Sequence, residues 1–145
     1  MKLFLTIWIA AVAVFGQSEN GKQGKQGSQA SQAKVLNRAE IDTLLEKPDQ
    51  VLILDVRRPD EIQTIGGFPV YLNVQIAELE KSLAFIPRDR TIIALSNHAS
   101  RGGRAADILT KGGFKVAGAA GAEDYESQGG KLVKITPPPN PNKKQ

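Results

Sequence analysis

The stretch from Thr91 to Leu109 constrains the fold of this 145-residue chain most strongly. Residues 91–95 form a short apolar run rich in β-branched side chains, which predicts a buried strand. From Gly102 to about Lys111, apolar residues recur at helical spacing, which predicts a helix. Only six residues, 96–101, lie between the two. The sequence therefore predicts a strand, a tight loop and a helix in direct succession.

The rest of the chain from residue 34 continues this alternation. The continuous apolar run 51–54 predicts a central parallel strand, because such strands are buried on both faces. Asn37, followed three residues later by Glu40, predicts the capped start of a helix. The other predicted elements are strands at 35–36, 70–72 and 114–116, helices starting at Pro59 and spanning 76–83 and 123–126, and a loop over the rest of 118–130. Strands that alternate with helices predict one α/β domain with a mainly parallel central sheet flanked by helices.

The two ends of the chain differ from this middle part. Residues 1–16 combine Lys2 with a short apolar run and small residues, which is typical of a cleavable signal peptide. Residues 17–33 are Gly, Gln, Ser and Lys with almost nothing apolar, and predict a flexible linker. The folded domain is expected at 34–135, and a polar, Pro-rich disordered tail at 136–145. We expect a periplasmic or secreted protein with no stable membrane insertion after cleavage; an uncleaved anchor is the alternative.

The composition excludes several kinds of site. The chain has no cysteine, which excludes disulfides, thiolate metal sites and a cysteine nucleophile. His98 is its single histidine, so we predict no metal site, and nothing in the sequence indicates a cofactor. The net charge is +4, but no basic stripe is interleaved with aromatic residues. We therefore predict that the protein does not bind nucleic acid.

The tight loop between strand and helix predicts an anion-binding site. Backbone N–H groups turn inward there, and the start of the helix adds partial positive charge. The predicted anion-binding loop consists of Ser96, Asn97, His98, Ala99, Ser100, Arg101 and Gly102. Arg101 fits either capping of the loop or contact with the anion, while Asp55 and Arg57 fit a supporting role at the C-terminal edge of the sheet. Hydrolytic, phosphoryl-transfer and sulfur-transfer enzymes all use this arrangement, so it names no reaction.

Four segments, in matching order and spacing over residues 35–135, resemble motifs of rhodanese domains. Residues 55–61 match D-V-R-x-P-x-E, and residues 66–74 lie where the family has G-H-I-P-G-A-x-N-[IV]. Residues 96–114 resemble C-x(4)-R followed by A-A-x-x-L and x-G-[FY], and residues 119–124 are similar to the A-G-G-Y-E-D of small secreted single-domain rhodaneses. The resemblance implies a rhodanese-like fold.

The departures from the family pattern determine the functional prediction. Ser96 stands where active rhodaneses have the cysteine that carries the persulfide, and a hydroxyl cannot hold a persulfide. Gly67 replaces the family's histidine, and Ala120 replaces a glycine. We therefore predict a domain that is inactive as a sulfurtransferase and acts as a binding or regulatory module for a small oxyanion or a protein partner.

Two alternatives remain open. One is an enzyme of unknown reaction that uses Ser96 and His98, although the G-x-S-x-G elbow is absent because Ala94 and His98 occupy its glycine positions. The other is a structural or interaction domain with no ligand. An open loop with converging N–H groups would favour binding, a Ser96–His98 hydrogen bond would favour the enzyme, and a filled loop would favour the ligand-free domain.

Overall fold

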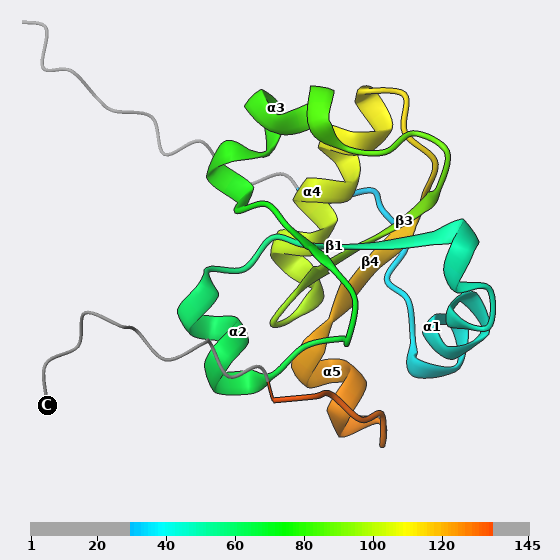
Figure 1. Cartoon of the computed structure of the whole chain (residues 1–145), viewed down its shortest axis with the longest axis vertical. Coiled ribbons are helices and arrows are strands. Elements are labelled where there is room, and N and C mark those ends of the chain that lie inside the picture. Colours follow the sequence, from blue (N-terminus) through cyan, green and yellow to red (C-terminus); the bar gives the residue numbers. More distant parts are fainter. Residues whose placement is uncertain (1–29, 135–145) are drawn as a thin grey trace, which may run out of the picture.

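Four parallel strands form the central sheet in a computed structural model that describes residues 30–134 (Figure 1). The strands are β1 (Val51–Asp55), β2 (Leu72–Asn73), β3 (Thr91–Ser96) and β4 (Val116–Gly121), in the spatial order β2-β1-β3-β4. The predicted α/β class and parallel sheet are confirmed. The predicted signal peptide at 1–16, residues 17–29 of the predicted linker and the predicted tail at 136–145 lie outside the described residues.

The central pair of strands explains the two continuous apolar runs of the sequence. β1 and β3 pair over five positions, from Val51 opposite Thr91 to Asp55 opposite Leu95. Successive side chains of a strand point to opposite faces, so a run that is apolar throughout needs a cover on both faces. Both strands are buried along almost their whole length, as this requires.

Helices provide that cover on both sides of the sheet (Figure 1). They are α1 (Arg38–Leu45), α2 (Pro59–Ile65), α3 (Leu79–Ser82), α4 (Ala99–Lys111) and α5 (Ala122–Ser127). Ile41 of α1 and Tyr125 of α5 pack with Ile93 on one face, while Leu79 of α3 and Leu109 of α4 pack with residues such as Ile92 on the other. The sheet therefore separates two apolar cores.

The start of α1 and the ends of the domain follow the sequence pattern closely. Asn37 and Glu40 form the predicted reciprocal cap. Val35 makes a single parallel bridge to Ala119 rather than a longer strand. At the other end, Val133 bridges antiparallel to Gly67, so the last described residues are tied to the domain.

The predicted bounds of α4 and β4 were wrong. The helix predicted from Gly102 begins at Ala99, which places Gly102 inside it. Glycine is a poor helix former, but here a Cβ atom would lie 2.6 Å from the backbone oxygen of Ala94, so glycine allows close packing of α4 on the sheet. The strand predicted at 114–116 runs instead from Val116 to Gly121, because its small residues are buried between neighbours despite their weak strand preference.

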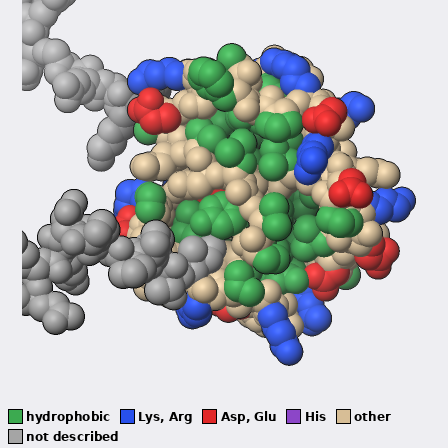
Figure 2. Space-filling model, in the orientation of Figure 1, with side chains coloured by type: hydrophobic (Ala, Val, Ile, Leu, Met, Phe, Trp, Pro, Cys, Tyr) green, Lys and Arg blue, Asp and Glu red, His purple; other side chains and the backbone are tan. Residues whose placement is uncertain are grey.

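The region around β2 is also less regular than predicted. The strand predicted at 70–72 is reduced to Leu72–Asn73, and the helix predicted at 76–83 is a short α3 flanked by single 3₁₀ turns at 76–78 and 83–85. Figure 2 shows hydrophobic side chains over the middle of one face and charged side chains toward its rim. No helix among residues 30–134 is both long and apolar enough to cross a lipid bilayer.

Candidate functional site

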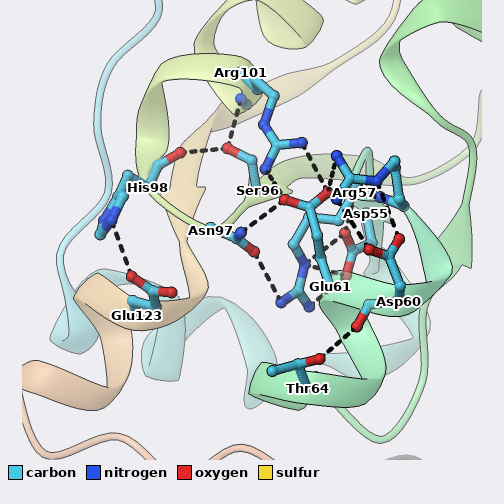
Figure 3. A network of polar contacts seen from close by, with 12 residues as sticks. Asp55, Arg57, Asp60, Glu61, Thr64, Ser96, Asn97, His98, Arg101 and Glu123 are labelled. Atoms are coloured by element: carbon cyan, nitrogen blue, oxygen red, sulfur yellow. Dashed lines mark hydrogen bonds and ion pairs between the residues drawn. The ribbon is translucent and has the colours of Figure 1, made fainter.

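The predicted loop lies at the C-terminal edge of the sheet, where β1 and β3 end side by side (Figure 3). Ser96 is the last residue of β3, and His98 is the N-cap of α4. Four of the seven predicted loop residues, Ala99 to Gly102, therefore belong to the first turns of α4 and not to the loop itself. The structure brings all seven predicted loop residues together with Asp55 and Arg57 at this edge.

The side chain of Ser96 fills the interior of the loop. Ser96 is completely buried, and its hydroxyl donates a hydrogen bond to the backbone carbonyl of His98. The same oxygen accepts a hydrogen bond from the backbone N–H of Gly102 at 2.8 Å. The hydroxyl thus joins both sides of the turn and is shielded from solvent.

A buried ion pair supports the loop from β1. The side chains of Asp55 and Arg57 are both 0% exposed, and Arg57 Nη2 lies 2.7 Å from Asp55 Oδ2. Arg57 also donates to the backbone carbonyl of Gly66 at 2.9 Å, and the side-chain amide of Asn73 donates to the carbonyls of Asp55 and Arg57. Because each charge has several partners, this pair holds the strand end and the turn after α2 together.

A second ion pair lies closer to the surface and was missed in the sequence. Glu61 of α2 accepts two hydrogen bonds from Arg101, at 2.6 and 2.9 Å, and a third from the side-chain amide of Asn97 at 2.8 Å. The Arg101 guanidinium is the main cause that lowers the pKa of Glu61 to about 2. The carboxylate of Glu61 therefore already pairs with the Arg101 guanidinium, for which the sequence left capping of the loop and contact with an anion open. Glu61 was visible as part of the D-V-R-x-P-x-E match, but its distant partners were not.

These two pairs are joined by one side chain. Arg57 donates from Nη1 to the Asn97 side-chain oxygen at 3.4 Å, while the Asn97 amide nitrogen donates to Glu61. Figure 3 shows the resulting chain of polar contacts from the buried end of β1 to the start of α4.

The imidazole of His98 points away from Ser96, toward α5 (Figure 3). Its Nε2 lies 2.9 Å from the carboxylate of Glu123, and its Nδ1 lies 3.1 Å from that of Asp124. The hydrogen bond with Asp124 is the largest cause that raises the pKa of His98 above its usual value, and Glu123 adds to it. The side chain is 65% exposed. The imidazole of His98 therefore anchors the loop to α5 and does not contact the Ser96 hydroxyl.

The backbone donors of the loop are only partly used. The N–H of Gly102 bonds to Ser96, and that of Ala99 bonds to Asp124 at 3.3 Å. For the N–H groups of Ser100 and Arg101, at the first turn of α4, residues 30–134 provide no acceptor. A groove runs beside this turn and is lined by Ala30, Ser31, Ala33, Val35, Ala99, Ser100, Gly103 and Arg104.

Metal binding has no candidate in the described part of the chain. Across residues 30–134, no group of three or more His, Asp or Glu side chains is arranged to hold a metal ion.

Comparison with known proteins shows likeness at the level of structure. No family model and no curated protein matches the sequence. The chain is similar to the structure of a rhodanese-related protein from Thermoplasma volcanium, with a TM-score of 0.59 and 26% identity over 70% of this chain and 99% of that one. It is also similar to a rhodanese-like domain protein from Staphylococcus aureus, with a TM-score of 0.59 and 17% identity over 71% of this chain and 99% of that one. A thiosulfate sulfurtransferase from Pseudomonas aeruginosa gives a TM-score of 0.57 and 29% identity over 70% of this chain, which spans 20% of that protein.

Proposed function

We propose that this chain, which has a rhodanese-like fold and no cysteine, does not transfer sulfur and acts as an exported binding or regulatory module. The proposal rests mainly on the burial and the hydrogen bonds of the Ser96 side chain. Its hydroxyl is buried and bonded on both sides within the turn, so no reactive group faces the solvent at the position of the family's sulfur carrier. A thiolate is the nucleophile of sulfur transfer, and this chain has none.

The Ser96 side chain fills the interior of the loop, which by itself favours a domain with no ligand at that point. The support for a binding role comes instead from the first turn of α4. The N–H groups of Ser100 and Arg101 lie at the start of a 13-residue helix, where they form part of its partial positive charge, and a groove runs beside them. An oxygen of a small oxyanion, or of an acidic side chain on a partner protein, matches these donors. Because Glu61 already holds the Arg101 guanidinium, the bound group relies on backbone donors more than on that cation.

The serine-enzyme alternative has less support. A nucleophilic serine needs a general base in contact with its hydroxyl. The hydroxyl of Ser96 contacts the backbone carbonyl of His98, while the imidazole of His98 contacts Glu123 and Asp124. We therefore favour the binding module over an enzyme that uses Ser96 and His98.

Sulfur transfer is tested with thiosulfate and cyanide. We expect the purified wild-type protein to release thiocyanate no faster than the uncatalysed reaction. Ser96→Cys restores a thiol in the loop, and the start of α4 should lower its pKa below the free value of about 8.5. Wild-type activity that follows the protein through purification and is lost in Ser96→Ala would overturn the proposal.

Binding is tested by thermal shift with sulfate, phosphate, thiosulfate and sulfite. A ligand present at about 100 times its dissociation constant stabilises the folded state by about 2.7 kcal/mol. Ser100→Pro removes one of the two free N–H donors in a helical turn that tolerates proline, and Ser100→Ala keeps it. We expect Ser100→Pro alone to lose the shift. No shift with any of the four anions would leave the ligand-free interaction domain as the better description.

Export is tested in bacterial cells that express the full chain. The proposal expects a product outside the cytoplasm that lacks residues 1–16. A full-length cytoplasmic product would contradict export but not the binding role.

A further inference from the structure

We propose that His98 is a pH-sensitive clamp that fastens the loop and the start of α4 to α5 when its imidazole carries a proton. The clamp joins residues that the sequence separates widely, since His98 follows β3 whereas Glu123 and Asp124 lie in the first turn of α5. The clamp itself does not depend on the proposed binding role; only its effect on ligand affinity rests on that role.

The positions of the two ring nitrogens carry the inference. Nε2 lies 2.9 Å from a Glu123 oxygen and Nδ1 lies 3.1 Å from an Asp124 oxygen, so each nitrogen faces an acceptor. A neutral imidazole has only one N–H, and its second nitrogen is itself an acceptor. The Nδ1 contact is a hydrogen bond and the Nε2 contact is an ion pair. Only the imidazolium, which carries an N–H on both nitrogens, satisfies both carboxylates. Loss of the proton sets a lone pair against a carboxylate and breaks one contact.

The backbone around this histidine is attached to the same helix. The N–H of Glu123 donates to the carbonyl of Asn97 at 3.0 Å, and the N–H of Ala99 donates to the second oxygen of Asp124 at 3.3 Å. Asp124 thus contacts both the imidazole and the first residue of α4. A change in the protonation of the imidazole therefore acts on the first residue of α4 through the shared Asp124 carboxylate.

The charges around the clamp set its response to pH. From α5, Glu123 and Asp124 face the imidazole, and they are the charged groups that raise its pKa. On the other side of the loop, Arg101 is turned toward Glu61 of α2 (Figure 3). Because the folded pKa is raised above the usual value of about 6.5, the clamp is intact below about pH 6.5 and is lost as the pH rises through the folded pKa.

The same change should alter binding at the first turn of α4. When His98 loses its proton, the cluster of His98, Glu123 and Asp124 becomes more negative by one charge, next to the free donors of Ser100 and Arg101. One unit charge within about a helical turn changes an affinity by roughly threefold in water-like surroundings. If the proposed binding role holds, anions should bind more tightly at low pH than at high pH.

The clamp is tested by following the imidazole resonances of His98 by NMR against pH. His98 is the only histidine of the chain, so the signal is unambiguous. We expect a pKa above about 6.5 in the wild type, with the amide resonances of Asn97 and Ala99 shifting in the same titration. Glu123→Gln should lower the pKa of His98, whereas Glu126→Gln, an exposed carboxylate on the same helix, should not. A histidine that titrates near 6.5, equally in both variants, would overturn the proposal.

A second measurement separates the clamp from the proposed binding role. Sulfate keeps its charge across this range, so its dissociation constant can be compared at about pH 6 and about pH 9 at constant ionic strength. We expect roughly threefold tighter binding at the lower pH in the wild type and no such difference in His98→Gln. Equal binding at both pH values overturns the effect on affinity. Absence of binding at both pH values, for sulfate and for the other three anions of the thermal-shift test, overturns the binding role, while the NMR titration still decides the clamp.

Discussion

Two clusters of charge sit at the same edge of the sheet, and they differ chiefly in burial. Asp55 and Arg57, at the end of β1, are both 0% exposed. His98, after the end of β3, is 65% exposed, and its partners Glu123 and Asp124 are each 43% exposed. The first cluster lies inside the fold and the second lies on its surface.

This difference assigns the two clusters different roles. A buried charge that loses its partner is left without solvation, so the Asp55–Arg57 pair has to stay intact for the domain to stay folded. Exposed charges are solvated and screened, so the His98 cluster contributes little stability and is free to change its protonation. The Glu61–Arg101 pair, at 14% and 27% exposed, lies between these extremes.

The largest effect is expected for the buried pair. Arg57→Met removes the cation but leaves the Asp55 carboxylate in the interior, and should lower the free energy of unfolding by about 3–5 kcal/mol in urea denaturation. Arg58→Met is the matched control, because Arg58 is exposed and its shortest ion pair, with Asp60, lies at the surface, and it should show little change. Equal losses of unfolding free energy in the two variants would mean that burial does not determine how much an ion pair contributes to stability.

The buried hydroxyl of the loop comes next. Ser96→Ala leaves the N–H of Gly102 and the carbonyl of His98 without their partner, and should cost about 1–3 kcal/mol in the same measurement. Ser100→Ala, which changes an exposed serine in the first turn of α4, is the control and should have little effect. If Ser96→Ala matches the control, the hydroxyl does not hold the turn together.

The Glu61–Arg101 pair should make the free energy of unfolding fall at acidic pH. The pKa of Glu61 is lowered to about 2 in the folded protein, whereas a free glutamate titrates near 4.3. The ionised Glu61 therefore stabilises the folded state fully above about pH 4.3, and this stabilisation is lost as the pH falls toward 2. The free energy of unfolding should fall by about 1–2 kcal/mol over this range, after allowance for solvent screening. Glu61→Gln should remove this part of the acid dependence of urea denaturation. An unchanged acid dependence in Glu61→Gln would show that the pair is not formed in solution.

The smallest effect is expected for the exposed cluster. His98→Gln should lower the melting temperature slightly at about pH 6, and this difference should vanish as the pH rises through the folded pKa of His98. Added salt should reduce it further, because the cluster is exposed. A difference that persists at high pH and high salt would point to packing of the ring instead of its charge.

The parts of the fold that were predicted correctly are those that residues close together in the sequence determine. The apolar runs at 51–54 and 91–95 and the cap formed by Asn37 and Glu40 depend on local spacing alone, and the structure has all of them. The strand at 116–121 was predicted at 114–116 instead, because alanine and glycine give no local strand signal and only burial against β3 makes this segment a strand.

The site was predicted in its position but not in its contacts. The loop was found because a strand is followed closely by a helix. The partners of Arg101 and His98 lie far away in sequence, at Glu61 and at Glu123 and Asp124, and no local pattern connects them. Their pairing arises only when parallel strands bring α2, α4 and α5 to one edge of the sheet.

The strand order also determines when this domain can fold during synthesis. The central pair cannot form until Thr91, the partner of Val51, has been made. The first bridged residue, Val35, has to wait still longer, because its partner is Ala119 in the last strand. Contacts between residues so distant in sequence slow folding. The nascent chain therefore remains without its complete sheet until nearly the whole domain has been synthesised, and folding begins late.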